Sequence, residues 1–404
     1  MRILCLADDY PWPPRSGYHQ RMDQLLGALT DEAAVDLFCA VRPGELNPDP
    51  PGCAVARWTA CPVRDLRRGP TLALRTAVDD RPRRIAWRDW NAARRALAGW
   101  IRPPYDLIWC THTDPYVGLL ESAEVREALT GLGPAPPVVV DLVDLEDLAL
   151  RSRRQVRHPT GSAGDRARGV ARSGMDRLDE VRWRRMQRRV ALRSSALVCS
   201  EADRARLAAP ADVVPNGYHD PGPPPDLPAE PVLVMVGLFV YPPNQDAARW
   251  FAGEVLPLVQ ARVPRAQVRL IGRHGGALDD LRTVPGVSVL GEVADVTAEL
   301  GRARGVVVPL RSGSGTRIKI LEAFAHGVPV VSTAIGCEGI DAEPGRHLLV
   351  ADEPERFAAE CVRVLTDDAL AMDLRAAARA LFEARYRWSD IRPLVGAMVT
   401  ALTH

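Results

Sequence analysis

The sequence predicts an α/β protein made of two doubly wound domains. The chain has 404 residues, a length that favours two domains. In both halves of the chain, a continuous apolar run typical of a buried strand is followed by a glycine-containing loop and a helix, as in residues 1–29 and 305–333. This strand–loop–helix order is the repeating unit of a doubly wound sheet. A proline-rich stretch, His219–Pro231, separates the halves and is typical of a stiff linker. We therefore expect two Rossmann-like domains.

The first half begins with strand Arg2–Ala7, whose apolar run is typical of a strand covered on both faces. A proline-rich loop, Asp8–Gly17, follows and leads to a helix at His19–Leu29. The same reasoning predicts strands at Ala34–Ala40, Asp106–Cys110, Pro137–Leu142 and Ala196–Ser200, and helices at Asp179–Arg193 and Glu201–Leu207.

Residues Asp79–Trp100 are expected to form one arginine-rich amphipathic helix with three tryptophans, Trp87, Trp90 and Trp100. Such a helix can contact a membrane surface or an acidic acceptor. Peripheral membrane contact is therefore possible, although a solvated surface helix that packs its tryptophans inward is favoured.

The second half restarts with strand Val232–Val236 and Gly237, followed by helix Gln245–Arg262. Its apolar runs and helical spacings predict strands at Val268–Gly272, Val287–Leu290, Val306–Leu310, Pro329–Thr333 and Leu348–Ala351, and helices from about Thr316 to Gly327 and at Pro354–Thr366, Leu370–Arg385 and Trp388–Thr403.

Composition excludes several classes of protein. A net charge of +1 with 47% hydrophobic residues is typical of a soluble, core-forming chain and argues against nucleic-acid binding. The eight cysteines show no C-x-x-C or Cys/His ligand spacing, so we expect free thiols, a reducing compartment and no structural zinc. The first apolar run is too short for a signal peptide, and no stretch approaches the length of a membrane span, so we expect a cytoplasmic protein.

The loop and helix after Val306–Leu310 carry the clearest chemistry. Gly313 and Gly315 allow the backbone to come close to a ligand. Arg317 and Lys319 fall in the expected first helical turn, where two cations cost roughly 0.3–1 kcal/mol each in the absence of an anion. The glycine loop, the free N–H groups and the two cations together predict a phosphate site.

Two residues of this helix have alternative interpretations. Lys319 is the only lysine in the chain, which favours a role in the site; alternatively, the helix start is solvated and Lys319 forms an i,i+3 ion pair with Glu322. Glu322 lies on a helix that should be half buried, so its carboxylate needs partners. Those partners are either neighbouring sugar hydroxyls, such as those of a ribose, or Lys319.

The segment 312–340, SGSGTRIKILEAFAHGVPVVSTAIGCEGI, resembles the nucleotide-sugar signature of the family 4 retaining glycosyltransferases, which have the GT-B fold. In that family two glutamates, separated by seven residues, span this loop and helix. The second glutamate matches Glu322 and implies a contact with the ribose of a nucleotide. The first falls on Ser314, so the chain departs from the pattern where the family contacts the donor sugar.

The resemblance implies the remaining donor-site residues. Close relatives place an arginine directly after the glycine that follows the first strand of the second domain, and a lysine a few residues later, both on the diphosphate. Leu238 follows Gly237 here and no lysine follows, so this role is assigned to Arg317 and Lys319. The expected donor-binding residues are Gly237, Arg273, Gly313, Ser314, Gly315, Thr316 and Glu322.

In the first domain, His112 follows a strand end, where residues of a binding site lie in doubly wound sheets. The resemblance implies that His112 contacts the donor sugar near the reacting carbon. It also implies that Gly17 and Arg21, in the first loop and helix, and Asp144, after another strand, lie toward the acceptor. The alternatives are a structural histidine, a turn glycine and a solvated turn carboxylate.

The resemblance is strongest from about Val232 to Ala351 and implies the domain organisation. Residues 1–217 would bind the acceptor, 218–231 would be the linker, and 232–385 would bind the nucleotide sugar. Residues 386–404 would form a helix that crosses back to the first domain, with the two domains facing each other across a deep cleft.

The implied reaction is hexosyl-type transfer from a nucleoside-diphosphate sugar to an acceptor, with retention, and with His112, Arg317 and Lys319 as catalytic residues. No Asp-x-Asp motif stands at a strand end of the second half, so we expect neither a metal nor a cofactor beyond the co-substrate. The acceptor is expected to be a bacterial polysaccharide, a lipid-linked glycan or a small metabolite. A nucleotide-sugar 2-epimerase and a non-catalytic nucleotide-sugar-binding protein are the alternatives.

Overall fold

The computed structural model describes residues 1–14, 16–44, 52–67, 69, 72, 76, 78–102, 104–131, 135–156, 163–313, 315 and 317–404, without the side chains of 153, 155, 156 and 163–172. The chain divides into two compact units. The first contains Met1–Arg154, His158–Pro215 and Ile391–His404, and the second contains Gln155–Arg157 and Asn216–Asp390.

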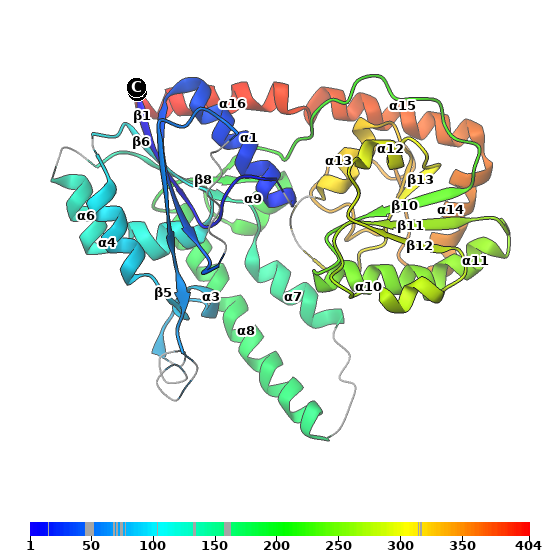
Figure 1. Cartoon of the computed structure of the whole chain (residues 1–404), viewed down its shortest axis with the longest axis horizontal. Helices are drawn as coiled ribbons and strands as arrows, with labels where there is room; N and C mark the ends of the chain where they lie inside the picture. Colours follow the sequence, from blue (N-terminus) through cyan, green and yellow to red (C-terminus); the bar gives the residue numbers. More distant parts are fainter. Residues whose placement is uncertain are drawn as a thin grey trace. The chain divides into compact units, whose positions relative to one another are not determined.

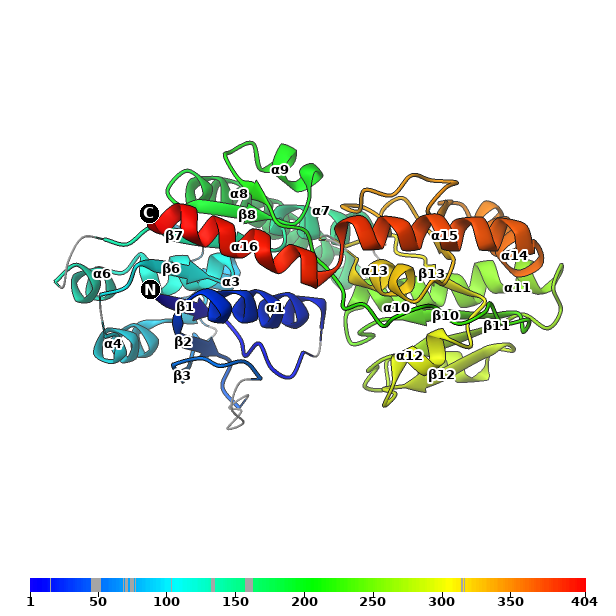
Figure 2. The ribbon, with the colours of Figure 1, turned by 90° about the horizontal axis from the view of Figure 1, so that it is seen from above.

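The first unit (Figure 1) is built on a seven-stranded parallel sheet with the order β3-β2-β1-β6-β7-β8-β9, of which all but β9 are labelled in Figure 2. The order reverses between β1 and β6, so the loops that follow these two strands lie next to each other. The strands are β1 (Arg2–Ala7), β2 (Ala34–Val41), β3 (Arg57–Pro62), β6 (Leu107–Cys110), β7 (Val138–Leu142), β8 (Ser195–Val198) and β9 (Asp212–Val213). A separate antiparallel pair joins β4 (Arg64–Asp65) to β5 (Arg88–Asp89).

Helix α1 (Gly17–Glu32) begins where the Ser16 side chain accepts a hydrogen bond from the backbone N–H of His19. It buries Met22 and Leu25, among other apolar residues, against the sheet. The other helical segments of the unit are α3 (Arg83–Ala86), α4 (Asn91–Trp100), α5 (Thr113–Pro115), the π-helical turn η1 (Tyr116–Leu120), α6 (Ala123–Thr130), α7 (Glu146–Val156), α8 (Ala163–Ala191) and α9 (Glu201–Leu207).

Residues 79–100 do not form the single amphipathic helix expected from the sequence, but fold into α3, β5 and α4. Pro82 occupies the position before α3, and a proline there disfavours helix in the residue before it. Trp90 is 3% exposed, and its ring packs so closely on Gly118 that a Cβ there would lie 2.5 Å from it. Trp90 is thus turned inward, whereas Trp87 and Trp100, which were expected to pack inward as well, are half buried.

The second unit is built on a six-stranded parallel sheet with the order β12-β11-β10-β13-β14-β15, with α10 on one side and α13 on the other (Figure 1). The strands are β10 (Val232–Val236), β11 (Gln267–Ile271), β12 (Val287–Gly291), β13 (Gly305–Val308), β14 (Val330–Ser332) and β15 (Leu349–Val350). The helical segments are α10 (Pro242–Trp250), η2 (Phe251–Val255), α11 (Leu256–Gln260), η3 (Asp279–Thr283), α12 (Val296–Leu300), α13 (Ile318–Ala325), α14 (Pro354–Thr366) and α15 (Asp368–Arg385).

The last helix, α16 (Trp388–Thr403), starts in the second unit, and its residues from Ile391 onward belong to the first unit. There it lies along α1 (Figure 2), where Arg392 forms an ion pair with Asp31. Val395 and Val399, four residues apart, are fully buried and form the apolar face of the helix. The C-terminal helix therefore completes the core of the first unit.

A buried ion pair lies at the centre of the first unit. Arg21 on α1 is 0% exposed, and its Nε and Nη2 atoms donate to the two carboxylate oxygens of Asp141 at 2.7 and 2.8 Å. Its Nη1 donates to the Val214 carbonyl oxygen at 2.9 Å. The expectation that Arg21 lies toward an acceptor is therefore wrong, because its charge is used inside the unit to join α1, β7 and the segment after β9.

We expect Arg21→Ala to lower the free energy of unfolding by about 3–5 kcal/mol, because Asp141 would remain as an unpaired buried charge. Urea denaturation measures the difference. The matched control is Arg204→Ala, since the ion pair of Arg204 with Glu201 has side chains 50% and 58% exposed and should contribute little. A loss no larger than that of the control would contradict the structural role of Arg21.

Candidate functional site

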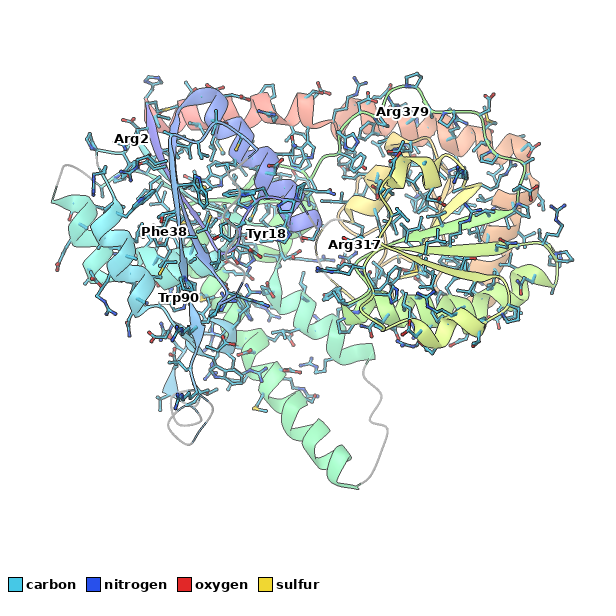
Figure 3. The ribbon with its side chains drawn as sticks, in the orientation of Figure 1. Arg2, Tyr18, Phe38, Trp90, Arg317 and Arg379 are labelled. Carbon is cyan, nitrogen blue, oxygen red and sulfur yellow. The ribbon has the colours of Figure 1, made fainter. Side chains whose placement is uncertain are left out.

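The loop after β13 lies where the strand order of the second sheet reverses. β10 and β13 are neighbours in this sheet although they are far apart in the sequence. Ligands bind parallel sheets of this kind outside the carboxyl ends of the strands at the reversal. Figure 3 shows Arg317 at this end of the second sheet. The anion site predicted from the sequence therefore occupies the position that the topology favours.

The glycine loop closes around the guanidinium of Arg317. Gly313 and Gly315 have φ angles of +132° and +76°, which glycine adopts without a steric cost. A Cβ on Gly313 would lie 2.9 Å from Arg317 Nη2, and Arg317 Nη1 donates to the Gly315 carbonyl oxygen at 2.7 Å. Because α13 begins at Ile318, Arg317 precedes the helix, and only Lys319 lies in its first turn.

Lys319 joins three segments of the second unit. Its Nζ donates to Asn244 Oδ1 at 3.1 Å, and a Cβ on Gly237 would lie 3.3 Å from this nitrogen. Asn244 Nδ2 donates in turn to the Leu238 carbonyl oxygen at 2.9 Å. No ion pair joins Lys319 to Glu322 or to another carboxylate in the part of the chain that the structure describes. The alternative of an i,i+3 pair is therefore absent.

Burial lowers the pKa of the Lys319 ammonium to about 7, and the charge of Arg317 lowers it as well, whereas Glu322 acts in the opposite direction. Two cations are thus held close together at the start of α13. An anion at this position would stabilise the charged form of Lys319 and raise its pKa. The electrostatics therefore favour an anionic ligand here.

Glu322 lies one turn after Lys319 and is 9% exposed. Its Oε1 accepts a hydrogen bond from the Tyr218 hydroxyl at 2.7 Å. Burial raises the pKa of Glu322, while this hydrogen bond and the charge of Lys319 act to lower it. The carboxylate is a fixed acceptor, suited to hydroxyl groups of a ligand.

The remaining predicted donor residues lie in different settings. The side chain of Arg273 is exposed, and its carbonyl oxygen accepts the backbone N–H of Phe239 at 2.8 Å. The adjacent Gly272 has a φ of +130° and approaches Gly237 so closely that a Cβ would lie 2.0 Å from the Gly237 carbonyl oxygen. Ser314 and Thr316 lie outside the described residues.

In the first unit, a second cluster of polar side chains lies where the strand order reverses between β1 and β6. Asp8 follows β1 and His112 follows β6. The Tyr18 hydroxyl, near the start of α1 (Figure 3), donates to Asp8 Oδ1 and lies 3.4 Å from Thr111 Oγ1. The Tyr18 ring meets the imidazole of His112 edge-on, with ring centroids 5.9 Å apart.

His112 is 5% exposed and lies between two carboxylates. Its Nδ1 is 3.6 Å from Asp114 Oδ1, and its Nε2 is 3.8 Å from Glu146 Oε1. Arg84 bridges the same carboxylates, since Nη2 donates to Asp114 at 2.9 Å and Nη1 donates to Glu146. Its guanidinium stacks on the Trp183 ring, 4.5 Å from the centroid. This frame fixes the orientation of the imidazole.

The carboxylates decide the protonation of His112. Burial and the charge of Arg84 act to lower the pKa of His112, but the hydrogen bond that Asp114 accepts and the charges of Asp8 and Asp114 outweigh them and raise it. Burial acts to raise the pKa of Asp114, yet Arg84 and His112 hold it well below its usual range. Asp114 is thus a charged partner for a histidine that gains a proton readily.

Two other predicted residues of the first unit are placed differently from His112. Gly17 is the half-buried first residue of α1. Asp144 is half buried, and its carbonyl oxygen accepts Gln187 Nε2 at 2.8 Å. Glu146, two residues later, is the carboxylate that comes within 3.8 Å of His112.

Over the described residues, no group of three or more His, Cys, Asp or Glu side chains is arranged to hold a metal ion. All eight cysteines are free thiols. Within the same residues, no helix combines the length and the apolar composition that a membrane crossing requires.

Solved structures resemble the chain over its whole length. Sucrose-phosphate synthase from Thermosynechococcus elongatus is 19% identical with a TM-score of 0.68, over 100% of this chain and 99% of that one. HepE of Anabaena, solved with UDP and glucose, is 14% identical with a TM-score of 0.61, over 98% and 99% of the two chains. The chain has the GT-B fold. Identities at this level establish the fold alone.

Sequence comparison assigns part of this GT-B chain more closely. Residues 230–367 match the family model for glycosyl transferases group 1, and this segment contains Gly237, Lys319 and Glu322. The phosphatidyl-myo-inositol mannosyltransferase of Propionibacterium freudenreichii is 29% identical over an alignment of 200 positions that covers 42% of this chain and 50% of that protein. A second curated relative is matched over 35% of its length, so the matches span half or less of these relatives.

Sequence reasoning missed four side chains that shape the two sites of the GT-B fold: Tyr218, Asn244, Arg84 and Glu146. Asn244 could have been found from the sequence, because it follows two prolines shortly after β10. That position is the end of a strand next to the point where the strand order reverses. Glu146 had a weaker one, because it follows β7 in an acidic turn. Tyr218 and Arg84 had none, since their roles depend on contacts across long stretches of sequence.

We expect Asp114→Asn to lower the pKa of His112, because burial and Arg84 would then outweigh the remaining charge of Asp8. An NMR titration of the His112 ring protons measures this shift. Asp280→Asn, at an exposed ion pair in the second unit, serves as the control and should leave the titration of His112 unchanged. A His112 pKa that stays the same or rises in Asp114→Asn would refute the role of Asp114.

Proposed function

We propose that this GT-B chain is a glycosyltransferase that moves a sugar from a nucleoside-diphosphate sugar to an acceptor. The observation that carries the proposal is the half-buried ammonium of Lys319, which Asn244 holds close to Arg317 where the strand order reverses. It lies in the segment that matches the glycosyl transferases group 1 model. A diphosphate is an anion that two neighbouring cations at the end of a parallel sheet are suited to bind.

The proposed chemistry uses these cations on the leaving group. When the bond from the anomeric carbon to the diphosphate oxygen breaks, negative charge grows on that oxygen. Groups that are already aimed at developing charge stabilise a transition state most effectively. Lys319 Nζ is held beside Gly237 by its hydrogen bond to Asn244 Oδ1, 3.1 Å away. The glycine loop holds Arg317, so both cations are in place before the bond breaks.

Glu322 is proposed to accept hydrogen bonds from the ribose of the nucleotide. It lies on the same helix as Lys319, and its carboxylate is held by Tyr218 at 2.7 Å. Retention at the anomeric carbon, a hexosyl donor and independence of metal ions are further parts of the proposal, and they rest on the resemblance of segment 312–340.

The first unit is proposed to contribute His112 to the donor sugar and carboxylates to the acceptor. His112 is oriented by Asp114, Glu146 and Arg84, which is the precision that contact with a reacting sugar requires. Glu146 replaces Asp144 as the proposed acceptor carboxylate because it is the one next to His112. HepE, the Anabaena protein of similar fold, was solved with UDP and glucose, which supports a nucleotide-sugar donor.

The test of the activity is turnover of UDP-, GDP- and ADP-linked hexoses by the purified protein, followed by chromatography with and without a panel of glycan and lipid-linked acceptors. Acceptor-dependent release of the nucleoside diphosphate, unchanged by EDTA, is expected. Conversion of the sugar at C2 without acceptor would indicate an epimerase. Ligand binding without turnover across the panel would favour a binding protein.

We expect Lys319→Ala to reduce turnover by about 100-fold or more, as when one donor to a developing oxyanion is removed, while the far-ultraviolet circular dichroism spectrum stays unchanged. Arg265→Ala, at an ion pair with side chains 80% and 67% exposed, is the matched control and should retain full turnover. Wild-type turnover in Lys319→Ala would rule out its role on the leaving group.

Affinity for UDP should fall as the pH rises above about 7. The pKa of Lys319 in the free protein is about 7, so above this pH the amine is neutral, and binding the diphosphate requires uptake of a proton. The dissociation constant should therefore rise by up to about tenfold per pH unit between pH 7 and 9. Isothermal titration calorimetry measures both the affinity and the proton uptake.

Lys319→Arg is the control for this pH dependence, because arginine stays charged throughout the range. Its affinity for UDP should be nearly independent of pH between 7 and 9. An equal pH slope in both proteins would show that another group titrates.

A further inference from the structure

Tyr218 connects the linker to the carboxylate of Glu322. It lies at the start of the segment Asn216–Asp390 of the second unit, and its hydroxyl donates to Glu322 Oε1 at 2.7 Å across 104 residues of sequence. The two side chains are buried, with exposures of 7% and 9%. A buried carboxylate that loses such a donor bears the cost of an unsatisfied charged group, so this bond has a strong effect on how Glu322 is held.

The backbone of Tyr218 is fixed independently of its hydroxyl. Its N–H donates to the Tyr386 carbonyl oxygen at 2.8 Å, and its carbonyl oxygen accepts the N–H of Trp388 at 3.2 Å. The ring stacks on His219 with centroids 4.2 Å apart. Removal of the hydroxyl therefore leaves the ring and the chain in place, which makes Tyr218→Phe a clean test of the hydrogen bond.

The second oxygen of Glu322 is left for another donor. Among the residues that the structure describes, no hydrogen bond reaches Oε2, and this atom keeps contact with solvent. A carboxylate held through one oxygen presents the other in a fixed direction. Preorganisation of this kind increases affinity because the side chain need not be ordered when the ligand binds.

We propose that Tyr218 is a positioning residue for the nucleotide: its hydroxyl fixes Glu322 so that the site favours a ribonucleoside diphosphate over one that lacks the ribose hydroxyls. This inference rests on the proposed function, since it requires a nucleotide beside Glu322. It assigns a role in specificity to a linker residue outside segment 312–340.

The test compares affinities for UDP, GDP and ADP with those for their 2′,3′-dideoxy forms, in the wild-type protein and in Tyr218→Phe. Tyr218→Phe should weaken binding of the preferred ribonucleotide by about threefold to tenfold, the range of one net hydrogen bond. Binding of the dideoxy form should be unchanged, because it offers no hydroxyl to Glu322. A purely structural role would weaken both ligands equally.

Tyr386→Phe is the matched control. Tyr386 is buried in the same unit, and its hydroxyl accepts the backbone N–H of Asp341 at 2.9 Å, away from Glu322. This variant should not change the ratio of the two affinities. In a Glu322→Gln background, Tyr218→Phe should likewise have little further effect on that ratio, because the carboxylate through which Tyr218 acts is gone.

The outcomes separate this inference from the proposed function. Failure of the wild-type protein to bind any nucleoside diphosphate would overturn the proposed function, and the inference with it. Wild-type binding without preference for the ribose form, or an equal loss for both ligands in Tyr218→Phe, would overturn the inference alone.

Discussion

A half-buried ammonium close to a guanidinium is the constraint on which the arrangement of the second unit depends. Lys319 and Arg317 lie within a few residues of each other, and burial disfavours the charge of the lysine. Asn244 and the Gly315 carbonyl oxygen satisfy donors of these groups but supply no negative charge. The free energy that this charge costs is recovered when an anion is bound, so part of the binding energy is stored in the unliganded site.

In the first unit, carboxylates rather than cations gather where the strand order reverses between β1 and β6. Asp8, Asp114 and Glu146 gather around His112, and Arg84 compensates two of them. Such a cluster offers carboxylate acceptors and suits neutral hydroxyl groups, which need acceptors rather than cations. The two sheets thus share a topology, whereas the loops at their strand ends give them different chemistry.

The sequence predicts the fold well where apolar runs decide the structure. The strands around β1, β10 and β13 were expected from such runs, because both faces of a parallel sheet exclude water. Residues 79–100 were predicted wrongly, because their helical spacing does not reveal that Trp90 packs against Gly118. The role of Arg21 was also predicted wrongly, because the sequence around an arginine in the first helix does not reveal that it pairs with Asp141, 120 residues later.

The candidate site shows the same limit. Gly313, Arg317, Lys319 and Glu322 lie within ten residues, so their chemistry could be recognised from local spacing. Their partners could not, because Asn244 is 75 residues from Lys319 and Tyr218 is 104 residues from Glu322. A hydrogen bond over that distance follows from the order of the strands, which no local pattern specifies.

The backbone pairing of Tyr218 with Arg387 places the beginning and the end of the second unit side by side. The first unit is therefore interrupted between Pro215 and Ile391 by a segment whose two ends meet. A segment with adjacent ends can be excised, transplanted or circularly permuted with little change to its own core.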